Sequence, residues 1–391
     1  MLKQNFKFIV LYLSCFMASF SYGFIYILPV IVKNLGGDTV DVGLILSYAG
    51  LAALMVVGFS GRLSHFFGAG KICSAGLLCN FLGFLIIYKM QSLGPSIYLA
   101  GLLLGTGWSL YYAASPMIIT PWVSDVRRGQ HLGLMAAFVV LGTGLGPCLG
   151  QALLLHGASI KNIYLIPLFL SFLSASLFYI QAGESSAPRA MISKVAIKSE
   201  KQAFRIFKIL KSEARYPLAM VFLGACMLSA MMNFQTVYAD EQQLNFSVYY
   251  FSYMSAVVLS RFLFGNFLSR KNPLAATPLL LLLMILGLAL LLINHHNPLF
   301  YAASALSLGL SYGLVYPLIK TQAVNITPQH ERQEVLAYFT LSYFLGMYGF
   351  PLIAGFVIKA YGFTALFTTL IVLVALDCFI GWRGSKRVGL T

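Results

Sequence analysis

Long apolar segments alternate with short polar ones along almost the whole chain. Twelve of the apolar runs have about the 20 residues that a membrane-spanning helix needs, and most of them are separated by only a few residues. The predicted helices occupy roughly residues 8–32, 42–62, 72–90, 95–117, 131–154, 162–182, 217–239, 246–269, 275–294, 298–320, 333–358 and 362–382. The pattern therefore predicts an all-α integral membrane protein.

One connection is much longer than the others and divides the pattern into six helices followed by six. It spans residues 183–216, so we expect an N-terminal bundle at 1–182 and a C-terminal bundle at 217–391. Near its end, Phe204 and Phe207 recur at helical spacing with Leu210, beside several lysines. This spacing predicts a short amphipathic helix that lies on the membrane surface.

Composition supports the membrane assignment and excludes other classes. Only 9% of the 391 residues are charged, whereas soluble domains carry about 25%. A soluble enzyme, a disordered scaffold or a disulfide-stapled secreted module is therefore excluded. The first apolar run is too long for the core of a signal peptide and lacks a cleavage site, so we interpret it as an uncleaved first helix.

The distribution of basic residues predicts the orientation. The chain has 26 lysines and arginines against 11 acids, a net charge of +15. Of the 26, 21 fall on the side of the termini and the central connection, four fall opposite, and Arg261 lies inside a helix. The positive-inside rule places both termini in the cytoplasm. We therefore expect a multi-pass protein of the bacterial inner membrane, and no nucleic-acid partner.

The six cysteines indicate neither a metal site nor a disulfide framework. They lie within or at the ends of apolar runs and form no CxxC pair or Cys/His spacing. We interpret them as small buried hydrophobes, and we expect no metal or cofactor.

The two halves repeat at a constant offset of 204 residues. The offset gives seven residue pairs: Gly61 with Gly265, Gly105 with Gly309, Trp108 with Tyr312, Tyr112 with Tyr316, Arg128 with Arg332, Gly142 with Gly346, and Pro147 with Pro351. Two like-oriented halves related about the membrane normal are the architecture of one class of transporters.

Two motifs carry a resemblance to the major facilitator superfamily that covers essentially the whole chain. The loop Gly61-Arg-Leu-Ser-His65-Phe-Phe-Gly-Ala-Gly-Lys71 resembles the family signature Gly-x-Leu-x-Asp-Arg-x-Gly-x-x-Lys/Arg, with His65 in place of the acid. The segment Gly142-x-x-x-Gly146-Pro147-x-x-Gly150 is similar to a pattern of the exporters and antiporters of that family. The resemblance implies two six-helix bundles related by pseudo-two-fold symmetry about the membrane normal, and transport by alternating access.

Candidate gating residues follow from these motifs. Gly142, Gly146 and Gly150 form one smooth helix face that permits close packing, and Pro147 permits a bend. We predict that this face lets one half rock against the other; the alternative is static packing. The remaining gating candidates are Gly61, Arg128, Arg261, Gly265, Arg332 and Pro351. For the arginines, the alternative is ordinary positive-inside charge, or for Arg261 a structural role.

Aromatic and polar residues mark a candidate substrate path. Trp108/Tyr112 and Tyr312/Tyr316 each lie four residues apart, on one face of a helix. Ser229, Asn233, Thr236 and Asp240 form a polar stripe on the seventh helix with Gln235 beside it, and the first helix adds Tyr22 and Tyr26. The resemblance implies that these helices line a central cavity. Stacking and neutral hydrogen bonds suit a small amphipathic organic molecule, although bundle packing alone also explains any single tyrosine.

The coupling mechanism is the least determined part of the sequence. Proton-driven carriers need a titratable group inside the bundle. The candidates are His65, Asp240 and Asp377. Asp377 precedes Trp382 and Arg383, so snorkelling to the interface is an alternative interpretation. The sequence does not identify which of these three residues carries the proton.

These observations favour a secondary transporter that exports a drug-like molecule, a metabolite or a siderophore, with protons as the candidate coupling ion. The alternative is an importer or facilitator of a nutrient or siderophore in the same fold. An enzyme is disfavoured because the chain has no HExxH, no GxSxG and no intramembrane Ser/His/Asp grouping. A receptor or structural role would leave the repeat unexplained. We expect a monomer in the lipid bilayer.

Overall fold

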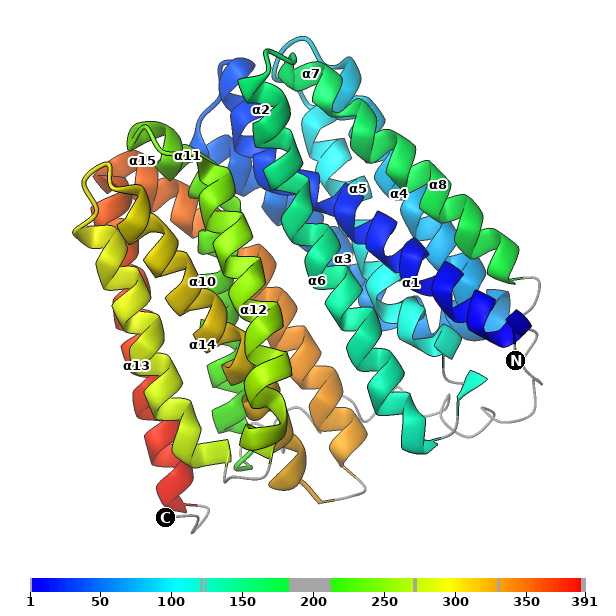
Figure 1. The fold of residues 1–391 in the computed structure, drawn as a ribbon, viewed down its shortest axis with the longest axis vertical. Coiled ribbons are helices and arrows are strands. Elements are labelled where there is room, and N and C mark those ends of the chain that lie inside the picture. The colour runs from blue at the N-terminus through cyan, green and yellow to red at the C-terminus, as the bar shows by residue number, and fades with distance from the viewer. Residues whose placement is uncertain are drawn as a thin grey trace.

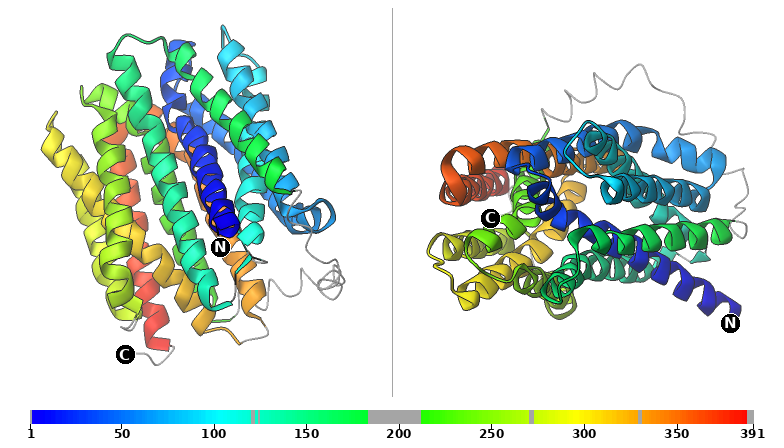
Figure 2. Two further views of the ribbon diagram at one scale, coloured as in Figure 1. Left: turned by 45° about the vertical axis from the view of Figure 1, so that its right-hand side comes forward. Right: turned by 90° about the horizontal axis from the view of Figure 1, so that it is seen from above.

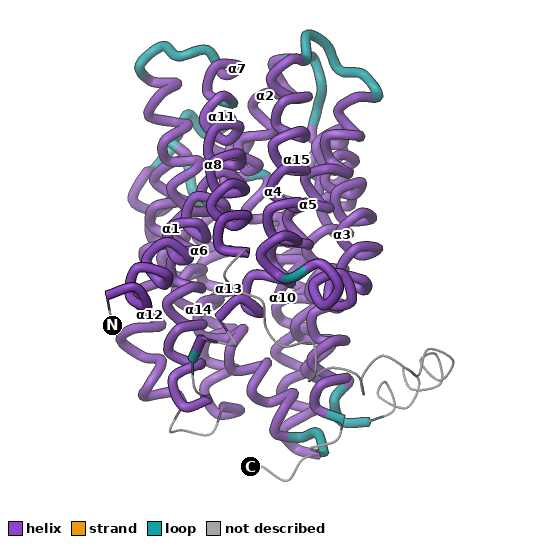
Figure 3. The backbone as a smooth tube through the Cα atoms, turned by 90° about the vertical axis from the view of Figure 1, so that its right-hand side faces the viewer, coloured by secondary structure: helices purple, strands orange, loops and turns teal. Residues whose placement is uncertain are grey.

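The computed structural model describes residues 2–119, 122–123, 125–182, 212–269, 273–328 and 331–387. These residues are mostly helical, and none of them forms a strand (Figure 3). The first half comprises α1 (Leu2–Gly23), η1 (Phe24–Ile27), α2 (Leu28–Asn34), α3 (Thr39–Phe67), α4 (Ala69–Lys89), α5 (Ser96–Ile119), α6 (Asp125–Leu155), α7 (Ile160–Ile163) and α8 (Leu165–Ala182). The second half comprises α10 (Arg215–Asn233), α11 (Gln235–Glu241), α12 (Phe246–Ser269), α13 (Pro273–Leu292), α14 (Pro298–Asn325) and α15 (Arg332–Arg387). The all-α membrane fold is confirmed, whereas the predicted amphipathic helix lies outside the described residues.

Each predicted apolar run coincides with one helix or with a broken one. The first run is broken into α1, η1 and α2, and the seventh into α10 and α11. The last two runs form the single element α15, which bends at Gly362. Gly362 has a φ of 77°, a backbone conformation that residues with a Cβ rarely adopt. A glycine there ends one membrane crossing and begins the next without an intervening loop.

The helices of each half pack mainly on one another. In the first half, α5 contacts α3 and α4, α8 contacts α4 and α1, and α6 contacts α1. In the second half, α15 contacts α10 and α13, while α14 contacts α12 and α13. Figure 1 and the view from above in Figure 2 show the two groups side by side.

Equivalent contacts recur at the 204-residue offset. A Cβ placed on Gly83 would lie 2.9 Å from Leu104 Cγ, and a Cβ placed on Gly287 would lie 2.9 Å from Leu308 Cγ. Gly105 meets the backbone of Ala49 in the same way as Gly309 meets that of Tyr253. The repeat therefore preserves the packing of helices and not only the residue types.

The two halves meet chiefly through α3 against α15 and α6 against α12. The side of the molecule that holds α2, α7 and α11 is called the α2 end, and the side that holds the chain termini is the terminal end (Figure 1). Near the α2 end, Thr39 Oγ1 donates to the Gly355 carbonyl at 2.9 Å, and the Pro351 carbonyl lies against Gly43. Toward the terminal end, the helices of the two halves lean apart in Figures 1 and 2.

The six cysteines are free thiols in the structure. Cys15, Cys73 and Cys226 are buried, and the other three are half-buried. They contribute to packing as small apolar side chains.

Candidate functional site

Aromatic side chains from both halves gather where the halves meet. The rings of Tyr22 and Trp108 stack with their centroids 4.0 Å apart, so α1 and α5 present one continuous aromatic surface. Trp108 also stacks on Tyr112 at 6.1 Å. Tyr22 shares a hydrogen bond with Tyr348 of α15, with the two hydroxyl oxygens 3.2 Å apart. Three predicted residues of the first half are therefore brought together, and one of them bonds directly to the second half.

The second half also contributes a group of aromatic rings. Tyr312 and Tyr316 of α14 stack at 6.1 Å, and Tyr316 contacts Tyr343 at 5.4 Å. Two ring pairs cross between the halves. They are Tyr112 with Phe344 at 6.1 Å and Tyr26 with Tyr250 at 5.7 Å. Stacking on aromatic faces therefore dominates the chemistry available at this interface.

Four members of this cluster were missed by the sequence reasoning. Tyr250 lies on α12, and Tyr343, Phe344 and Tyr348 lie on α15. Phe344 and Tyr348 have the same spacing of four residues that identified the other aromatic pairs. Extending that search beyond the first, fourth, seventh and tenth helices would have found them.

The polar stripe of the seventh helix divides into two parts. Ser229 Oγ donates to the Met347 carbonyl of α15, and Asn233 Nδ2 donates to the Ser229 carbonyl at 2.8 Å. Thr236 is buried and its hydroxyl has no partner among the described residues. Gln235 departs from the predicted grouping: its Oε1 accepts from Tyr301 of α14 at 3.0 Å, inside the second half. The helix breaks between Asn233 and Gln235, which turns this amide away from the other polar residues.

The glycine face of α6 packs closely against helices of the first half. Gly142 lies against the backbone of Phe16, and Gly146 lies against that of Gly23. Gly150 lies against Ile27. All three partners belong to the first apolar run, because the face points toward α1 and η1. A role of this face in motion stays a prediction.

The intervening glycine makes the contact with the other half. A Cβ on Gly144 would lie against the side chain of Met254 on α12. Nearer the α2 end, Cys148 Sγ contacts the Ser247 carbonyl at 3.7 Å. The two faces of α6 therefore serve different interfaces.

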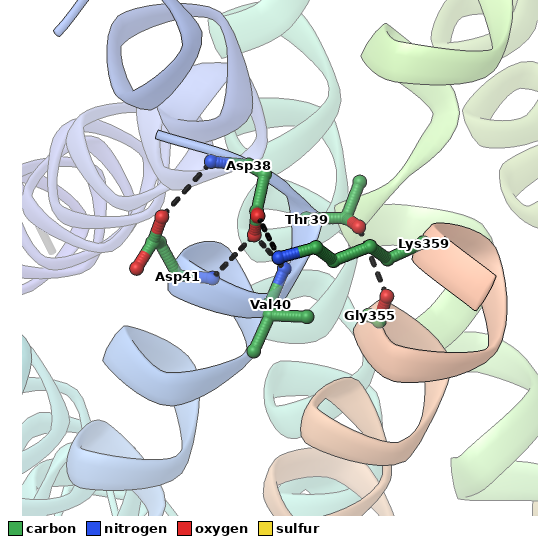
Figure 4. Close-up of polar contacts among 6 residues, drawn as sticks. All are labelled: Asp38, Thr39, Val40, Asp41, Gly355 and Lys359. Atoms are coloured by element: carbon green, nitrogen blue, oxygen red, sulfur yellow. Dashed lines mark hydrogen bonds and ion pairs between the residues drawn. The ribbon is translucent and has the colours of Figure 1, made fainter. Parts of the chain in front are cut away.

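Two ion pairs join the halves at the α2 end, and together they are called the α2-end latch. Lys33 pairs with Asp240, and Lys359 Nζ lies 2.6 Å from Asp38 Oδ2 (Figure 4). Asp38 also accepts from the backbone N–H of Val40 at 2.7 Å. The hydrogen bond from Lys359 holds the pKa of the Asp38 carboxyl below its ordinary value.

The Asp240 neighbourhood contains a second acid. Burial raises the pKa of Glu241, and the adjacent Asp240 carboxylate raises it further, while Lys33 lowers it. Lys33 therefore faces two acids. Asp240, predicted as a coupling candidate, has a side chain that is 60% exposed, and the contact that the structure gives it is the pair with Lys33.

The predicted gating residues are distributed over several contacts. Arg332 Nε donates to the Thr327 carbonyl at 3.2 Å, and Arg261 Nε donates to the Gly313 carbonyl at 3.3 Å. Both bonds lie within the second half, and the Arg261 bond links α12 to α14. Pro351 lies between the halves against Gly43. Gly61, His65, Arg128 and Gly265 lie in stretches whose side chains the structure does not describe. The roles of these four residues therefore stay predictions.

Asp377 is buried inside the second half. Its side chain is 1% exposed, so the snorkelling interpretation is wrong. It lies on the face of α15 that is turned toward α10 and α14, where it lines a small cavity with Gly224 and Tyr312. Among the described residues, no three His, Cys, Asp or Glu side chains are grouped so that they could hold a metal ion.

Comparison with known proteins identifies the family. The sequence profile of the Major Facilitator Superfamily matches residues 8–348 and 281–388. A multi-drug resistance efflux pump PmrA homolog of Lactococcus lactis is 26% identical over 402 residues, covering 97% of this chain and 95% of that protein. The MFS-type transporter YhhS of Shigella flexneri is 26% identical over 359 residues, covering 88% of this chain and 84% of that protein.

Solved structures share the fold at low sequence identity. The nucleoside transporter NupG has a TM-score of 0.79 at 14% identity, covering 97% of this chain and 99% of that one. The peptide transporter POT has a TM-score of 0.72 at 15% identity, covering 97% and 95%. With the profile match extending over nearly the whole chain, the protein belongs to the major facilitator superfamily of membrane transporters.

Proposed function

We propose that the chain is a secondary active transporter that exports a small amphipathic organic compound across the bacterial inner membrane. The observation that carries the proposal is the aromatic cluster between the halves, in which Tyr22 stacks on Trp108 and bonds to Tyr348. Aromatic faces with a few neutral hydrogen-bonding groups match a compound that has an apolar body and polar substituents. A drug-like molecule, a metabolite and a siderophore all fit this description.

The contacts between the two halves support a proposal of alternating access. The proposed moving units are residues 1–182 and 217–391, joined by residues 183–216 in the cytoplasm with both termini. The α2 end then faces the periplasm and is closed by the latch and by the close approach of α3 to α15. In this arrangement the substrate enters from the cytoplasmic side, and opening the α2 end releases it outside.

Export is supported by the glycine-proline motif of α6 and by the similarity to an efflux pump of Lactococcus lactis. The alternative is import or facilitated diffusion of a nutrient or siderophore. The similarity of the fold to nucleoside and peptide transporters supports this alternative. Both functions use the same site, so only the direction of transport separates them.

Everted membrane vesicles test the direction. The vesicles are incubated with ethidium, Nile red and an extract of the small molecules of the host cell, and their contents are analysed by mass spectrometry. The proposal expects accumulation that depends on the proton gradient and is lost in Trp108→Ala. It also expects accumulation to be retained in Leu99→Ala, which changes a half-exposed leucine on the same helix. Uptake by intact cells without accumulation in everted vesicles would establish the import alternative instead.

A further inference from the structure

The second half contains a buried carboxyl group for which its neighbours provide no counter-charge. Asp377 is the one charged side chain among the described residues that is buried. Its Oδ1 has no hydrogen-bond partner there. Buried charges in membrane proteins are costly unless they are paired, and they commonly mark functional sites.

A second unpartnered polar group shares the same cavity. The Tyr312 hydroxyl is buried without a hydrogen-bond partner among the described residues, and both Tyr312 and Asp377 line the cavity between α10, α13, α14 and α15. A Cβ on Gly224 would lie 3.9 Å from the Tyr312 ring and 4.0 Å from Asp377 Oδ2. The glycine therefore leaves free space beside both groups.

The surroundings favour the uncharged carboxylic acid. Met220, Met284 and Val315 supply apolar walls, and the titratable neighbours are Tyr312, Tyr316 and Cys378, which are neutral at pH 7. Arg261 donates a hydrogen bond to the carbonyl of Gly313, the residue that follows Tyr312. None of the ion pairs among the described residues includes Asp377. An unpaired carboxylate in such a place binds a proton rather than remaining ionised.

The size and donor set of the cavity select the ligand. The space beside Asp377 is too small for an organic molecule, and a metal ion would require several oxygen ligands, whereas this cavity offers one carboxylate. Tyr312 connects the cavity to the interface between the halves, because it stacks on Tyr316, which in turn contacts Tyr343. A proton on a water molecule is the species that fits.

We propose that Asp377 and Tyr312 form a proton-binding site in the second half, which loads and unloads as the two halves change conformation. The inference rests on the proposed transport function and names the coupling ion. In the conformation described here the carboxyl group carries the proton. When the halves rearrange, water reaches Asp377 past Tyr312, the carboxyl group releases its proton to that water, and the resulting carboxylate is solvated.

Infrared spectroscopy of the full chain in lipid nanodiscs tests the binding site without a substrate. The wild type is expected to show the carbonyl stretch of a protonated carboxylic acid at pH 7. This band should be lost in Asp377→Asn and retained in Asp240→Asn, which removes an exposed acid. Tyr312→Phe keeps the ring and should shift the position of the band, which a purely structural tyrosine would not do.

Several outcomes would overturn the site. They are a wild-type spectrum without the band, a band that survives in Asp377→Asn, or a band that disappears when sodium chloride replaces potassium chloride, which would indicate a sodium site. Thermal unfolding of Asp377→Asn shows whether the variant is folded, and the isosteric Asp377→Asn should unfold at or above the wild-type temperature because it removes a buried ionisable group.

A transport measurement separates this inference from the proposed function. In everted vesicles, Asp377→Asn should lose accumulation driven by the proton gradient but keep exchange of labelled for unlabelled compound. Unchanged proton-driven accumulation in a folded Asp377→Asn protein would refute the coupling role. If wild-type vesicles transport nothing while the infrared band behaves as expected, the export proposal fails and the proton site stands.

Discussion

Three glycines of α6 lie in different environments, and substituting each by alanine separates fold stability from conformational change. Gly146 faces the backbone of Gly23 in the same half, and Gly144 faces Met254 of the other half. A Cβ on Gly133 would have no neighbouring atom within 4 Å among the described residues. The three substitutions are chemically identical and lie on one helix. Any difference between them therefore reports the surroundings.

The structure gives the expected size of each effect. A Cβ on Gly146 would lie 2.7 Å from the Gly23 carbonyl carbon and 2.9 Å from its Cα, and both are backbone atoms that move only with the helix. Overpacking of this kind costs about 1–3 kcal/mol. We expect this cost in every conformation, because α6 and α1 belong to the same half and stay together. At Gly144 the clash is with Met254, so the same cost applies only while the halves are closed at the α2 end. A cost of about 1–3 kcal/mol shifts that equilibrium by about 5- to 150-fold.

Spin labels measure the opening, and thermal unfolding measures the stability. The labels are placed at Ser92→Cys and Tyr361→Cys, two exposed residues of the α2 end that belong to different halves, after the six native cysteines are replaced. Gly144→Ala should lengthen the distance between the labels with little change in unfolding temperature. Gly146→Ala should lower the unfolding temperature and leave the distance distribution unchanged, and Gly133→Ala should do neither.

The opposite pattern would refute this reasoning. A longer distance in Gly146→Ala, with an unchanged distance in Gly144→Ala, would mean that the glycine face of α6 is the moving surface after all.

Three further predictions concern the latch, the aromatic cluster and the repeat. Replacing both Lys33 and Lys359 by Gln should lengthen the same spin-label distance, whereas Lys89→Gln at the same end should not. Pairing with Lys359 lowers the pKa of Asp38. The ion pair therefore stabilises the closed end fully above the ordinary pKa of an aspartate, about 3.9, and this stabilisation is lost as the pH falls through the lowered pKa. Acid should lengthen the spin-label distance in the wild type and have less effect in Lys359→Gln. Trp108→Ala should weaken binding of the transported compound about 2- to 13-fold by calorimetry, since an aromatic stack contributes about 0.5–1.5 kcal/mol, and Trp108→Phe should restore most of the affinity. Gly105→Val and Gly309→Val should each lower the unfolding temperature, because equivalent backbone contacts leave no room for a side chain, whereas Gly349→Ala should not.

The sequence predicted the helices well because hydropathy reports depth in the membrane directly. All twelve apolar runs correspond to helices or broken helices among the described residues, and the 204-residue offset reappears as equivalent contacts at Gly83 and Gly287. The breaks were not predicted. Pro29, at the start of α2, was a local signal for the break of the first run, because a proline has no N–H with which to continue a helix.

The candidate site was predicted only in part because spacing identifies a helix face but not the neighbour it meets. Tyr112 of the Trp108 pair contacts the other half through Phe344, but the sequence reasoning did not find Tyr348, to which Tyr22 bonds. Gln235 turns inward at a helix break. Asp377 is followed by Trp382 and Arg383, residues typical of the membrane surface, and its burial follows from the packing of α15 on α10 rather than from its depth.

The central claim is that this transporter exports an amphipathic organic compound through the aromatic cluster between its halves. The most direct test compares the small molecules inside and outside cells that carry the wild-type chain, Trp108→Ala or no copy at all. The account predicts at least one amphipathic compound that is depleted inside and enriched outside only in wild-type cells. Enrichment of such a compound inside wild-type cells, or an identical profile in wild-type and Trp108→Ala cells, would contradict it.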